Sequence, residues 1–218
     1  MPFFSQHNFP VLWELFQYWI GGTTDKRRLS LRKYNGQKRV LEVGCSVGNL
    51  ARAFQSFPEI SYTGIDIDST AIRRAQKKYD HVPQFRFVCK DLRDFSESEE
   101  RFDYIVLAGV CHHVEDSSLR RMMHAARHML SEKGSLIVVD FLIPRLEDSW
   151  FLKLFWKIDQ GRFPRDEEQM EKFLRNLDGL HLSEVEMDFV GCTPFSWPLC
   201  ARFGIYTLGS KVMSVPLG

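Results

Sequence analysis

The chain has 218 residues, of which 44% are hydrophobic and 13% aromatic, and its 29 Lys and Arg balance 28 Asp and Glu. A chain of this length buries roughly 70% of its unfolded surface, which suits one globular domain over residues 1–218 and excludes a disordered or fibrous chain. A formal net charge of +1 gives no overall attraction to nucleic acid or to anionic membranes.

Cysteine usage and the first apolar stretch both indicate a soluble cytoplasmic protein. The 5 cysteines are an odd number, lie far apart and include no C-x-x-C pair, so we expect neither a disulfide framework nor a metal site. The apolar stretch 11–20 is interrupted by Glu14 and Gln17 and is too short to span a bilayer. It also carries no signal-peptide features.

Strand and helix patterns alternate through the first two thirds of the chain. Four apolar runs predict buried strands: 40–43, 62–67, 85–89 and 104–107. One helical pattern stops before Pro58, and another begins from an expected N-cap at Ser69. A third helix over 119–130, with Gly134 as its expected C-cap glycine, leads into a strand at 136–139. This alternation predicts a parallel, doubly wound sheet.

The alternation changes after Phe141. Residues 142–180 carry two helical patterns and no strand pattern, and strands return at about 181–190 and 203–208. The long connection between these two strands favours an antiparallel pair at the sheet edge. We therefore expect one domain with four segments: an N-terminal lid and basic segment (1–38), a cofactor-binding core (39–141), a helical lid insertion (142–180) and a C-terminal strand pair (181–210).

The glycine-bearing turn after the first strand lies where a parallel sheet binds its ligands. Gly44 and Gly48 allow a tight turn and a close approach of the backbone to a ligand, and the amides of the following helix favour anionic groups. The dinucleotide pattern G-x-G-x-x-G needs a glycine where this chain has Ser46, which disfavours a nicotinamide cofactor. We predict a small adenine-containing cofactor.

Two carboxylates lie close to this turn in the predicted sheet. Asp66 ends the second strand about 20 residues after the turn, where it could accept hydrogen bonds from ribose hydroxyls. Glu42 lies within the first strand, where burying an unpaired carboxylate costs roughly several kcal/mol. We expect Glu42 to face the ligand, and an acid exposed at a sheet edge is the alternative.

Five segments in this order resemble a class I S-adenosylmethionine-dependent methyltransferase of the small-molecule type: VLEVGCSVGNL, GIDID, CKDLRDF, FDYIVLAGVCHHVED and LSEKGSLIVVDFL. The resemblance covers residues 39–141 and extends to about 210. It implies an α/β fold with a doubly wound, seven-stranded, mostly parallel Rossmann-like sheet whose last strand is antiparallel. It also implies S-adenosyl-L-methionine as the cofactor.

The same resemblance implies which residues bind the cofactor. The first motif would surround its methionine part through Glu42, Gly44, Cys45 and Gly48. The ends of the next three strands would contact the ribose, the adenine and the methionine amino group, through Asp66 with Ile67, Asp91 with Leu92, and Ala108 with Gly109, with Ile67 also against the adenine. We interpret the Cys45 thiol as a packed side chain rather than a nucleophile.

His113 and His112 are the candidate catalytic residues, as a general base or for positioning the acceptor. They follow the fourth strand, and imidazole titrates near neutral pH, so it could take a proton from a hydroxyl or phenol. A base helps only where the acceptor is protonated at neutral pH. The alternative is that this turn hydrogen-bonds the backbone.

The predicted acceptor is a small organic molecule of aromatic, lipidic or anionic character. Aromatic side chains of an N-terminal helix and of the insertion would cover it, with packing in the helix core as the alternative: Trp13, Phe16, Trp19, Trp150, Phe151, Phe155 and Trp156. The fourth strand lacks the Asn-Pro-Pro-Tyr type of signature, which disfavours adenine and glutamine as acceptors.

A basic run precedes the first strand: Lys26, Arg27, Arg28, Arg32, Lys33, Lys38 and Arg39. It could bind an anionic acceptor, RNA or a membrane surface, but we favour a solvated surface. The predicted activity is O-, N- or C-methylation of a small acceptor. The alternatives are an RNA or protein methyltransferase that uses residues 26–39 and a non-catalytic, methyltransferase-like binding subunit.

Overall fold

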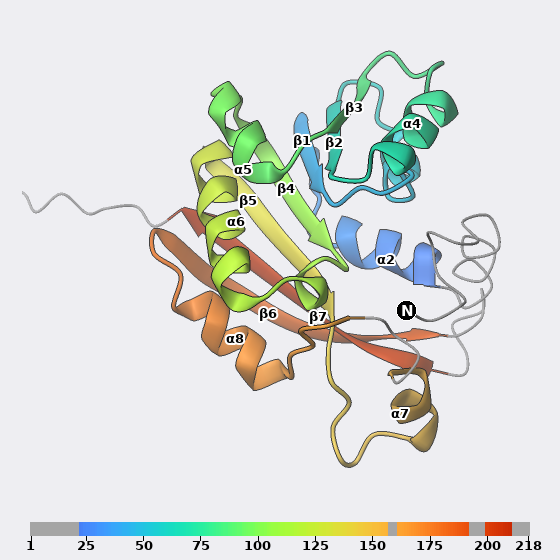
Figure 1. Cartoon of the computed structure of the whole chain (residues 1–218), viewed down its shortest axis with the longest axis vertical. Helices are drawn as coiled ribbons and strands as arrows, with labels where there is room; N and C mark the ends of the chain where they lie inside the picture. The colour runs from blue at the N-terminus through green and yellow to red at the C-terminus, as the bar shows by residue number, and fades with distance from the viewer. Residues whose placement is uncertain (1–21, 157–160, 192–198, 211–218) are drawn as a thin grey trace, which may run out of the picture.

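The computed structural model describes residues 22–156, 161–191 and 199–210, which form a seven-stranded sheet of order β3-β2-β1-β4-β5-β7-β6 (Figure 1). The strands are β1 Arg39–Val43, β2 Ser61–Asp66, β3 Phe85–Cys89, β4 Phe102–Ala108, β5 Leu130–Phe141, β6 Leu180–Gly191 and β7 Leu199–Ser210. Strands β1 to β5 are parallel, whereas β7 runs antiparallel to both β5 and β6. This sheet confirms the predicted fold class, including the antiparallel last strand.

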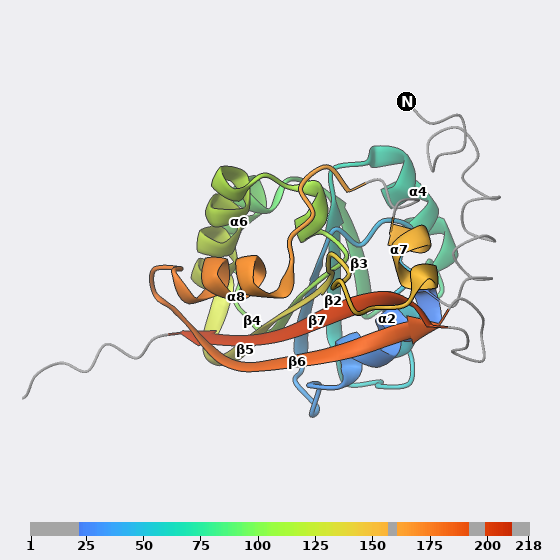
Figure 2. The same ribbon diagram turned by 90° about the horizontal axis from the view of Figure 1, so that it is seen from below.

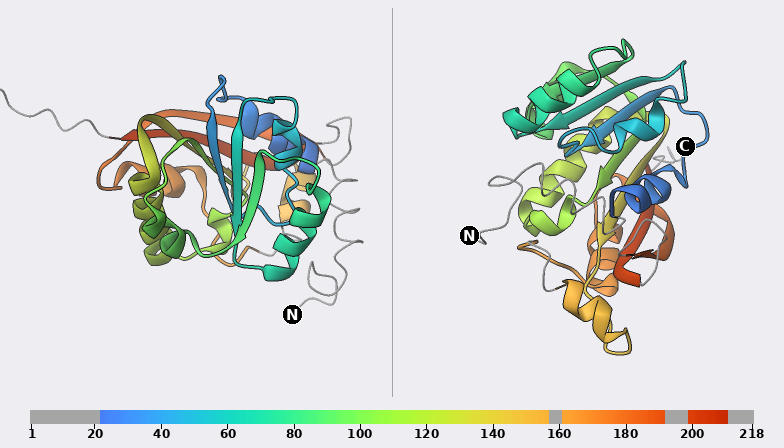
Figure 3. Two further views of the ribbon diagram at one scale, coloured as in Figure 1. Left: turned by 90° about the horizontal axis from the view of Figure 1, so that it is seen from above. Right: turned by 90° about the vertical axis from the view of Figure 1, so that its right-hand side faces the viewer.

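Helices cover both faces of the sheet, and Figure 3 shows α6 and α4 on opposite sides. The helices are α2 Gly22–Leu31, α3 Ala51–Phe54, α4 Ser69–Lys78, α5 Leu92–Phe95, α6 Asp116–Met129, α7 Trp150–Trp156 and α8 Glu167–Arg175, with 3-10 turns η1 Ser96–Ser98 and η2 Cys111–His113. One core lies under α5, α6 and α8, and the other under α2, α3 and α4. No helix in these described ranges is long and apolar enough to cross a membrane.

Successive side chains along each strand point into opposite cores, and the parallel strand register places the ends of several strands at one edge of the sheet. Leu41 packs into the core under α6, whereas its neighbour Val40 packs into the core under α4. In the parallel register, Val43 lies beside both Ile65 and Leu107. The carboxyl ends of β1, β2 and β4 therefore meet at one edge, where their turns come together.

Two predicted helix boundaries are wrong, for identifiable reasons. Helix α6 ends at Met129 because Leu130 already has extended backbone and pairs with Phe102, so Gly134 lies within β5 rather than at a C-cap. Helix α4 is capped by the Asp68 carboxylate, which accepts hydrogen bonds from two backbone amides at 2.8 and 3.2 Å, and Ser69 is the first helical residue.

Several aromatic residues predicted to cover the acceptor lie outside the described part of the chain: Trp13, Phe16 and Trp19, and the side chains of Phe151 and Phe155. Of the others, Trp150 is 71% exposed, whereas Trp156 is partly buried against the core under α4. The predicted aromatic cover therefore stays a prediction.

The basic run forms an ion-pair ladder with β6, and Figure 2 shows α2 beside the long β6–β7 pair. The ladder joins Arg28, Arg32 and Lys33 to Glu184, Glu186 and Asp188. Arg28 lies 2.9 Å from Asp188, Arg32 lies 3.1 Å from Glu186, and Lys33 lies 2.7 Å from Glu184. Outside the ladder, Arg39 pairs with Asp103 at 2.8 Å. The ladder therefore joins α2 and the residues just after it to β6, and the Arg39 pair joins β1 to β4.

The ion-pair ladder predicts an acid-dependent loss of stability. The hydrogen bond from Lys33 lowers the pKa of Glu186. Burial acts to raise the pKa of Asp188, but hydrogen bonds from Arg28 and from the backbone amide of Phe189 outweigh it and lower that pKa. Both acids therefore stabilise the fold above their unfolded pKa values, and this stabilisation is lost as the pH falls below about 4.5.

The double variant Glu186→Gln with Asp188→Asn should lose about 1 kcal/mol of unfolding free energy at pH 6, because the pairs are partly exposed. It should also show a flatter fall in stability from pH 6 to pH 3, measured by urea unfolding. Glu132→Gln, on the exposed start of β5, is the control. Parallel pH profiles for the double variant and the unmodified chain would show that the ladder contributes no stability.

Candidate functional site

The turn after β1 is held tightly between β2 and β4. The amides of Gly44 and Cys45 both donate to the carbonyl of Ile65, at 2.8 and 3.0 Å. Gly44 has a φ of +74°, and a Cβ on it would lie 2.6 Å from Cγ2 of Val110, in the turn after β4. Gly48 also has a φ of +74°, with the Tyr79 ring 2.8 Å from where its Cβ would lie. Glycine is therefore required at both positions.

Asp66 joins the first motif to the start of α4. Its Oδ2 accepts a hydrogen bond from the Ser46 amide at 2.8 Å, and its Oδ1 accepts one from the Asp68 amide at 2.9 Å. A carboxylate offers about four acceptor positions, so each oxygen keeps capacity for one more donor. The next side chain, Ile67, is apolar and 75% exposed. The structure therefore brings a two-oxygen acceptor and an open apolar surface together beside the first motif.

The end of β3 is arranged differently from the end of β2. Asp91 accepts hydrogen bonds from the backbone amide, Nε and Nη2 of Arg93, each at 2.8 Å, and this guanidinium lowers the pKa of the Asp91 carboxyl. The Leu92 side chain is 3% exposed and packs into the core beside Phe95. A contact of residue 92 with an adenine ring would therefore come from its backbone.

The end of β4 lies against the first motif. The Gly109 amide donates to the carbonyl of Val139 at 2.8 Å, and Ala108 is half-buried beside it. Since Val110 fills the space in front of Gly44, the two predicted contact regions for the methionine part of the cofactor are neighbours.

Glu42 and Cys45 are both buried beneath this turn. Glu42 is 4% exposed on β1, which pairs with a strand on each side, so the alternative of an acid exposed at a sheet edge is excluded. The Tyr62 hydroxyl donates to its carboxylate, as a buried carboxylate requires. Burial raises the pKa of the Cys45 thiol, which is 2% exposed. The thiol is therefore protonated and packed, which supports the structural interpretation of this cysteine.

The two histidines after β4 have different surroundings. His112 is 5% exposed, and its Nδ1 lies 2.5 Å from Oδ1 of the fully buried Asp140. His113 is exposed, with its ring centroid 4.0 Å from that of His112. A carboxylate at Nδ1 fixes the tautomer in which Nδ1 carries the proton, so Nε2 is the ring nitrogen that can act as a base.

Asp140 was missed at the level of the sequence, although a signal for it exists. It ends a continuous apolar run, where a carboxylate needs a buried partner for the same reason as Glu42 does. What the sequence does not contain is the identity of that partner, which is set by the pairing of β4 with β5.

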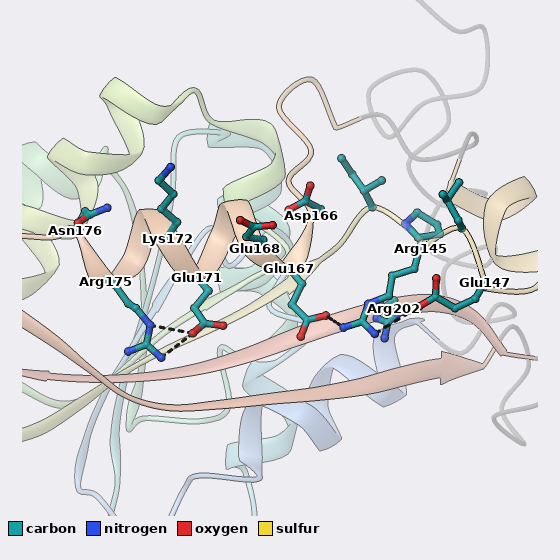
Figure 4. Close-up of a pocket in the computed structure, with 13 residues that line it drawn as sticks. Arg145, Glu147, Asp166, Glu167, Glu168, Glu171, Lys172, Arg175, Asn176 and Arg202 are labelled. Carbon is teal, nitrogen blue, oxygen red and sulfur yellow. Dashed lines mark hydrogen bonds and ion pairs between the residues drawn. The ribbon is translucent and has the colours of Figure 1, made fainter.

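A cavity of about 1040 Å³ lies between α8, the segment after β5, and β7 (Figure 4). Its walls carry charged side chains, several of which form ion pairs with one another: Figure 4 shows Arg145 paired with Glu167 and Arg175 paired with Glu171. None of the predicted cofactor-binding residues, all of which the structure describes, lines this cavity. It is separate from the edge formed by the ends of β1, β2 and β4.

Residues 40–134, which carry β1 to β4 and their turns, match a family model described as a methyltransferase domain. Over this range, which is less than half of the chain, the chain is similar to methyltransferase domains. The match supports the resemblance to class I S-adenosylmethionine-dependent methyltransferases that the sequence motifs indicate, and with it S-adenosylmethionine as the cofactor.

The chain has curated relatives of moderate similarity. An uncharacterized methyltransferase of Mycobacterium tuberculosis is 33% identical over 119 residues, which are 54% of this chain and 58% of that protein. A demethylmenaquinone methyltransferase of Thermotoga maritima is 25% identical over 148 residues, or 65% of this chain and 62% of that protein. The matches span less than two thirds of the length of these relatives.

Solved structures share the fold of this chain over most of its length. The mitomycin 7-O-methyltransferase MmcR has a TM-score of 0.69 at 17% identity, covering 94% of this chain and 59% of that one. The N-methyltransferase NodS of Bradyrhizobium japonicum in complex with S-adenosylhomocysteine has a TM-score of 0.61 at 21% identity, covering 88% and 86%. At these identities the likeness confirms the fold.

The residues of the site fit S-adenosylmethionine. The position of a Cβ on Gly44 is already filled by Val110, so the first motif and the turn after β4 pack directly against each other at this edge of the sheet. Asp66 keeps acceptor capacity on both oxygens for a pair of ribose hydroxyls, and exposed Ile67 offers an apolar surface for a flat ring. These are features that a nucleoside with a short polar tail requires.

Proposed function

We propose that this chain is an S-adenosylmethionine-dependent methyltransferase that transfers a methyl group to a hydroxyl oxygen of a small organic acceptor, with His112 as the general base. The observation that carries the proposal is the buried contact of 2.5 Å between Nδ1 of His112 and Asp140 at the carboxyl end of the sheet. A neutral amine can attack without losing its proton first, whereas a hydroxyl gains from a base near neutral pH.

Each residue has a defined part in the proposed reaction. When bound, S-adenosylmethionine supplies an electrophilic methyl group. Asp140 holds the imidazole of His112 with Nδ1 protonated, so that Nε2 accepts the proton of the acceptor hydroxyl as its oxygen bonds to the methyl carbon. Asp66 and Ile67 would hold the nucleoside so that the acceptor oxygen can lie about 3 Å from the methyl carbon, opposite the sulfur–carbon bond that breaks with its electron pair left on the sulfur.

The comparisons support a small acceptor. One structural neighbour is named a mitomycin 7-O-methyltransferase and another an N-methyltransferase, so both chemistries occur on this fold. The paired His112 and Asp140 favour the oxygen acceptor for this chain.

The alternatives have less support. An RNA or protein methyltransferase would need the basic run 26–39, but Arg28, Arg32 and Lys33 are paired with acids of β6. A non-catalytic binding subunit would not need a ring nitrogen base held in one tautomer, as Asp140 holds His112.

Two measurements test the proposal. Calorimetry should show binding of S-adenosylmethionine and S-adenosylhomocysteine but not of NAD, because the motif lacks the middle glycine that a pyrophosphate requires. A panel of phenols, alcohols and amines with methyl-labelled S-adenosylmethionine should then give O-methyl products, identified by mass spectrometry. Binding of NAD alone would overturn the cofactor, and label found in amines alone would overturn the oxygen acceptor.

A further inference from the structure

Arg165 is a buried cation next to the turn that carries His112. It is 6% exposed and lies just before α8. Its Nη1 donates to the carbonyl of Cys111 at 2.8 Å, and its Nη2 donates to the carbonyl of Val114 at 2.8 Å. These two carbonyls flank the pair His112 and His113, so one guanidinium bridges the ends of the histidine turn.

The remaining N–H groups of Arg165 are also used. Nε and Nη2 donate to Oδ1 of Asp116, at 3.0 and 2.5 Å, and Nη1 donates to the carbonyl of Phe163 at 3.1 Å. The guanidinium also lies over the Phe173 ring, 5.6 Å from its centroid. A guanidinium has five N–H donors, and all of them have partners here. A buried cation with this many matched acceptors is held in one orientation.

Two further contacts from the same segment reach His112 itself. The Phe163 amide donates to the His112 carbonyl at 2.9 Å. A Cβ on Gly161 would lie 2.6 Å from Cδ2 of His112, so the backbone of residue 161 packs against the edge of the imidazole. Segment 161–165 therefore contacts the histidine turn at the imidazole edge, at the His112 carbonyl and at both flanking carbonyls.

We propose that Arg165 is a positioning residue that holds the His112 imidazole in register with Asp140 and with the acceptor. This inference rests on the proposed role of His112 as the base. The turn η2 spans three residues and has no side-chain cap among the residues that the structure describes, so its own hydrogen bonds give the ring little support. A displacement of about 1 Å at a reacting group can cost about 10²-fold in rate, so this support has a direct effect on catalysis.

Lysine cannot replace arginine in this role. An ammonium offers three donors from one point, whereas the planar guanidinium reaches acceptors on opposite sides of its fork. The carbonyls of Cys111 and Val114 and the carboxylate of Asp116 are bonded through different nitrogens of Arg165. We therefore expect Arg165→Lys to keep the charge and lose the positioning.

The test compares Arg165→Lys and Arg165→Gln with Arg120→Gln in the full chain. Arg120 is a matched control because its guanidinium lies over the same Phe173 ring, at 5.2 Å, and donates to the Asn176 carbonyl at 2.8 Å. The hydrogen bond of Arg120 goes to the residue that follows α8 and not to the histidine turn. If Arg165→Gln does not fold, Asp116→Asn is the milder variant. It weakens only the ion pair between Arg165 and the exposed Asp116 carboxylate.

The first measurement is the imidazole nitrogen and proton NMR signal of His112, assigned by its loss in His112→Gln. Both Arg165 variants should shift this signal and lower kcat about 10²-fold with labelled S-adenosylmethionine and the best hydroxyl acceptor of the panel. The calorimetric affinity for S-adenosylmethionine should stay unchanged, and Arg120→Gln should keep all three properties.

The outcomes separate this inference from the proposed function. Unchanged His112 signals in Arg165→Lys and Arg165→Gln would overturn the positioning role, whatever the activity. The other informative outcome combines two results: the His112 signals differ between the Arg165 variants and the unmodified chain, but the unmodified chain methylates no hydroxyl. This outcome would overturn the base role of His112 and would still support the contact between Arg165 and the histidine turn.

Discussion

His112→Gln is expected to lower kcat for a hydroxyl acceptor by about 10²–10⁴-fold, the usual contribution of a positioned general base. Gln keeps a polar group that can bond to the buried Asp140 but has no group that titrates near neutral pH. Affinity for S-adenosylmethionine should not change, because the residues that fit the cofactor lie at the ends of β1 and β2. Initial rates and calorimetry on the same preparation measure both properties.

His113→Ala is the matched comparison for this prediction. His113 is exposed and its ring contacts that of His112, so its removal should leave most of the rate. A full rate in His112→Gln together with a large loss in His113→Ala would move the base to His113. A full rate in both variants would remove the general base from the mechanism.

Asp66→Asn should weaken S-adenosylmethionine binding by about 10²-fold. The carboxylate is expected to accept one hydrogen bond on each oxygen from the ribose, and hydrogen bonds to a charged group contribute about 1.5–3 kcal/mol each. An amide keeps one acceptor oxygen and presents N–H groups on the other side. Isothermal calorimetry measures the loss directly.

Asp66 also accepts hydrogen bonds from the backbone amides of Ser46 and Asp68 and so supports the first motif. Asn is therefore a better choice than Ala at this position, because it keeps a polar side chain of the same size. Asp68→Asn is the control, because position 68 lies two residues after Asp66 and Asn is an equally good N-cap for α4. Equal affinity in Asp66→Asn and the unmodified chain would contradict the ribose role, whereas equal losses in both variants would point to a general loosening of this turn.

The parts of the site that are local in sequence could be predicted from it. The first motif and Asp66 follow from a glycine turn after one strand and an acid at the end of the next, which any parallel sheet brings together. Asp140 lies 28 residues after His112, and their contact depends on the pairing of β4 with β5. Two adjacent histidines look alike in a sequence, and this long-range partner is what distinguishes them.

Arg165 and the basic run show the same limit for charged residues. Arg165 lies in the stretch before α8, where an arginine is usually solvated, but four of its five N–H donors find acceptors 49 to 54 residues earlier in the chain. Arg28, Arg32 and Lys33 of the basic run pair with acids more than 150 residues later, on a strand that the sequence predicts only by its apolar pattern. Charge pairing across a fold has no periodicity that a sequence displays.

Gly134 shows why the helix boundary was wrong. Leu130 continues the helical spacing and also begins the strand pattern, so both structures suit it equally. The pairing of Leu130 with Phe102 decides in favour of the strand, and this contact is tertiary.

The ion-pair ladder has a consequence for how copies of this chain meet. β6 is the last strand of the sheet in the described part of the chain, and its row of Glu184, Glu186 and Asp188 lies along one face. A second copy pairing antiparallel along this strand would set carboxylates opposite carboxylates, which is repulsive. With α2 in place the cations neutralise this row, so release of α2 would uncover a repulsive border rather than an adhesive one. The same acids that hold α2 would then disfavour the pairing of a second copy along β6.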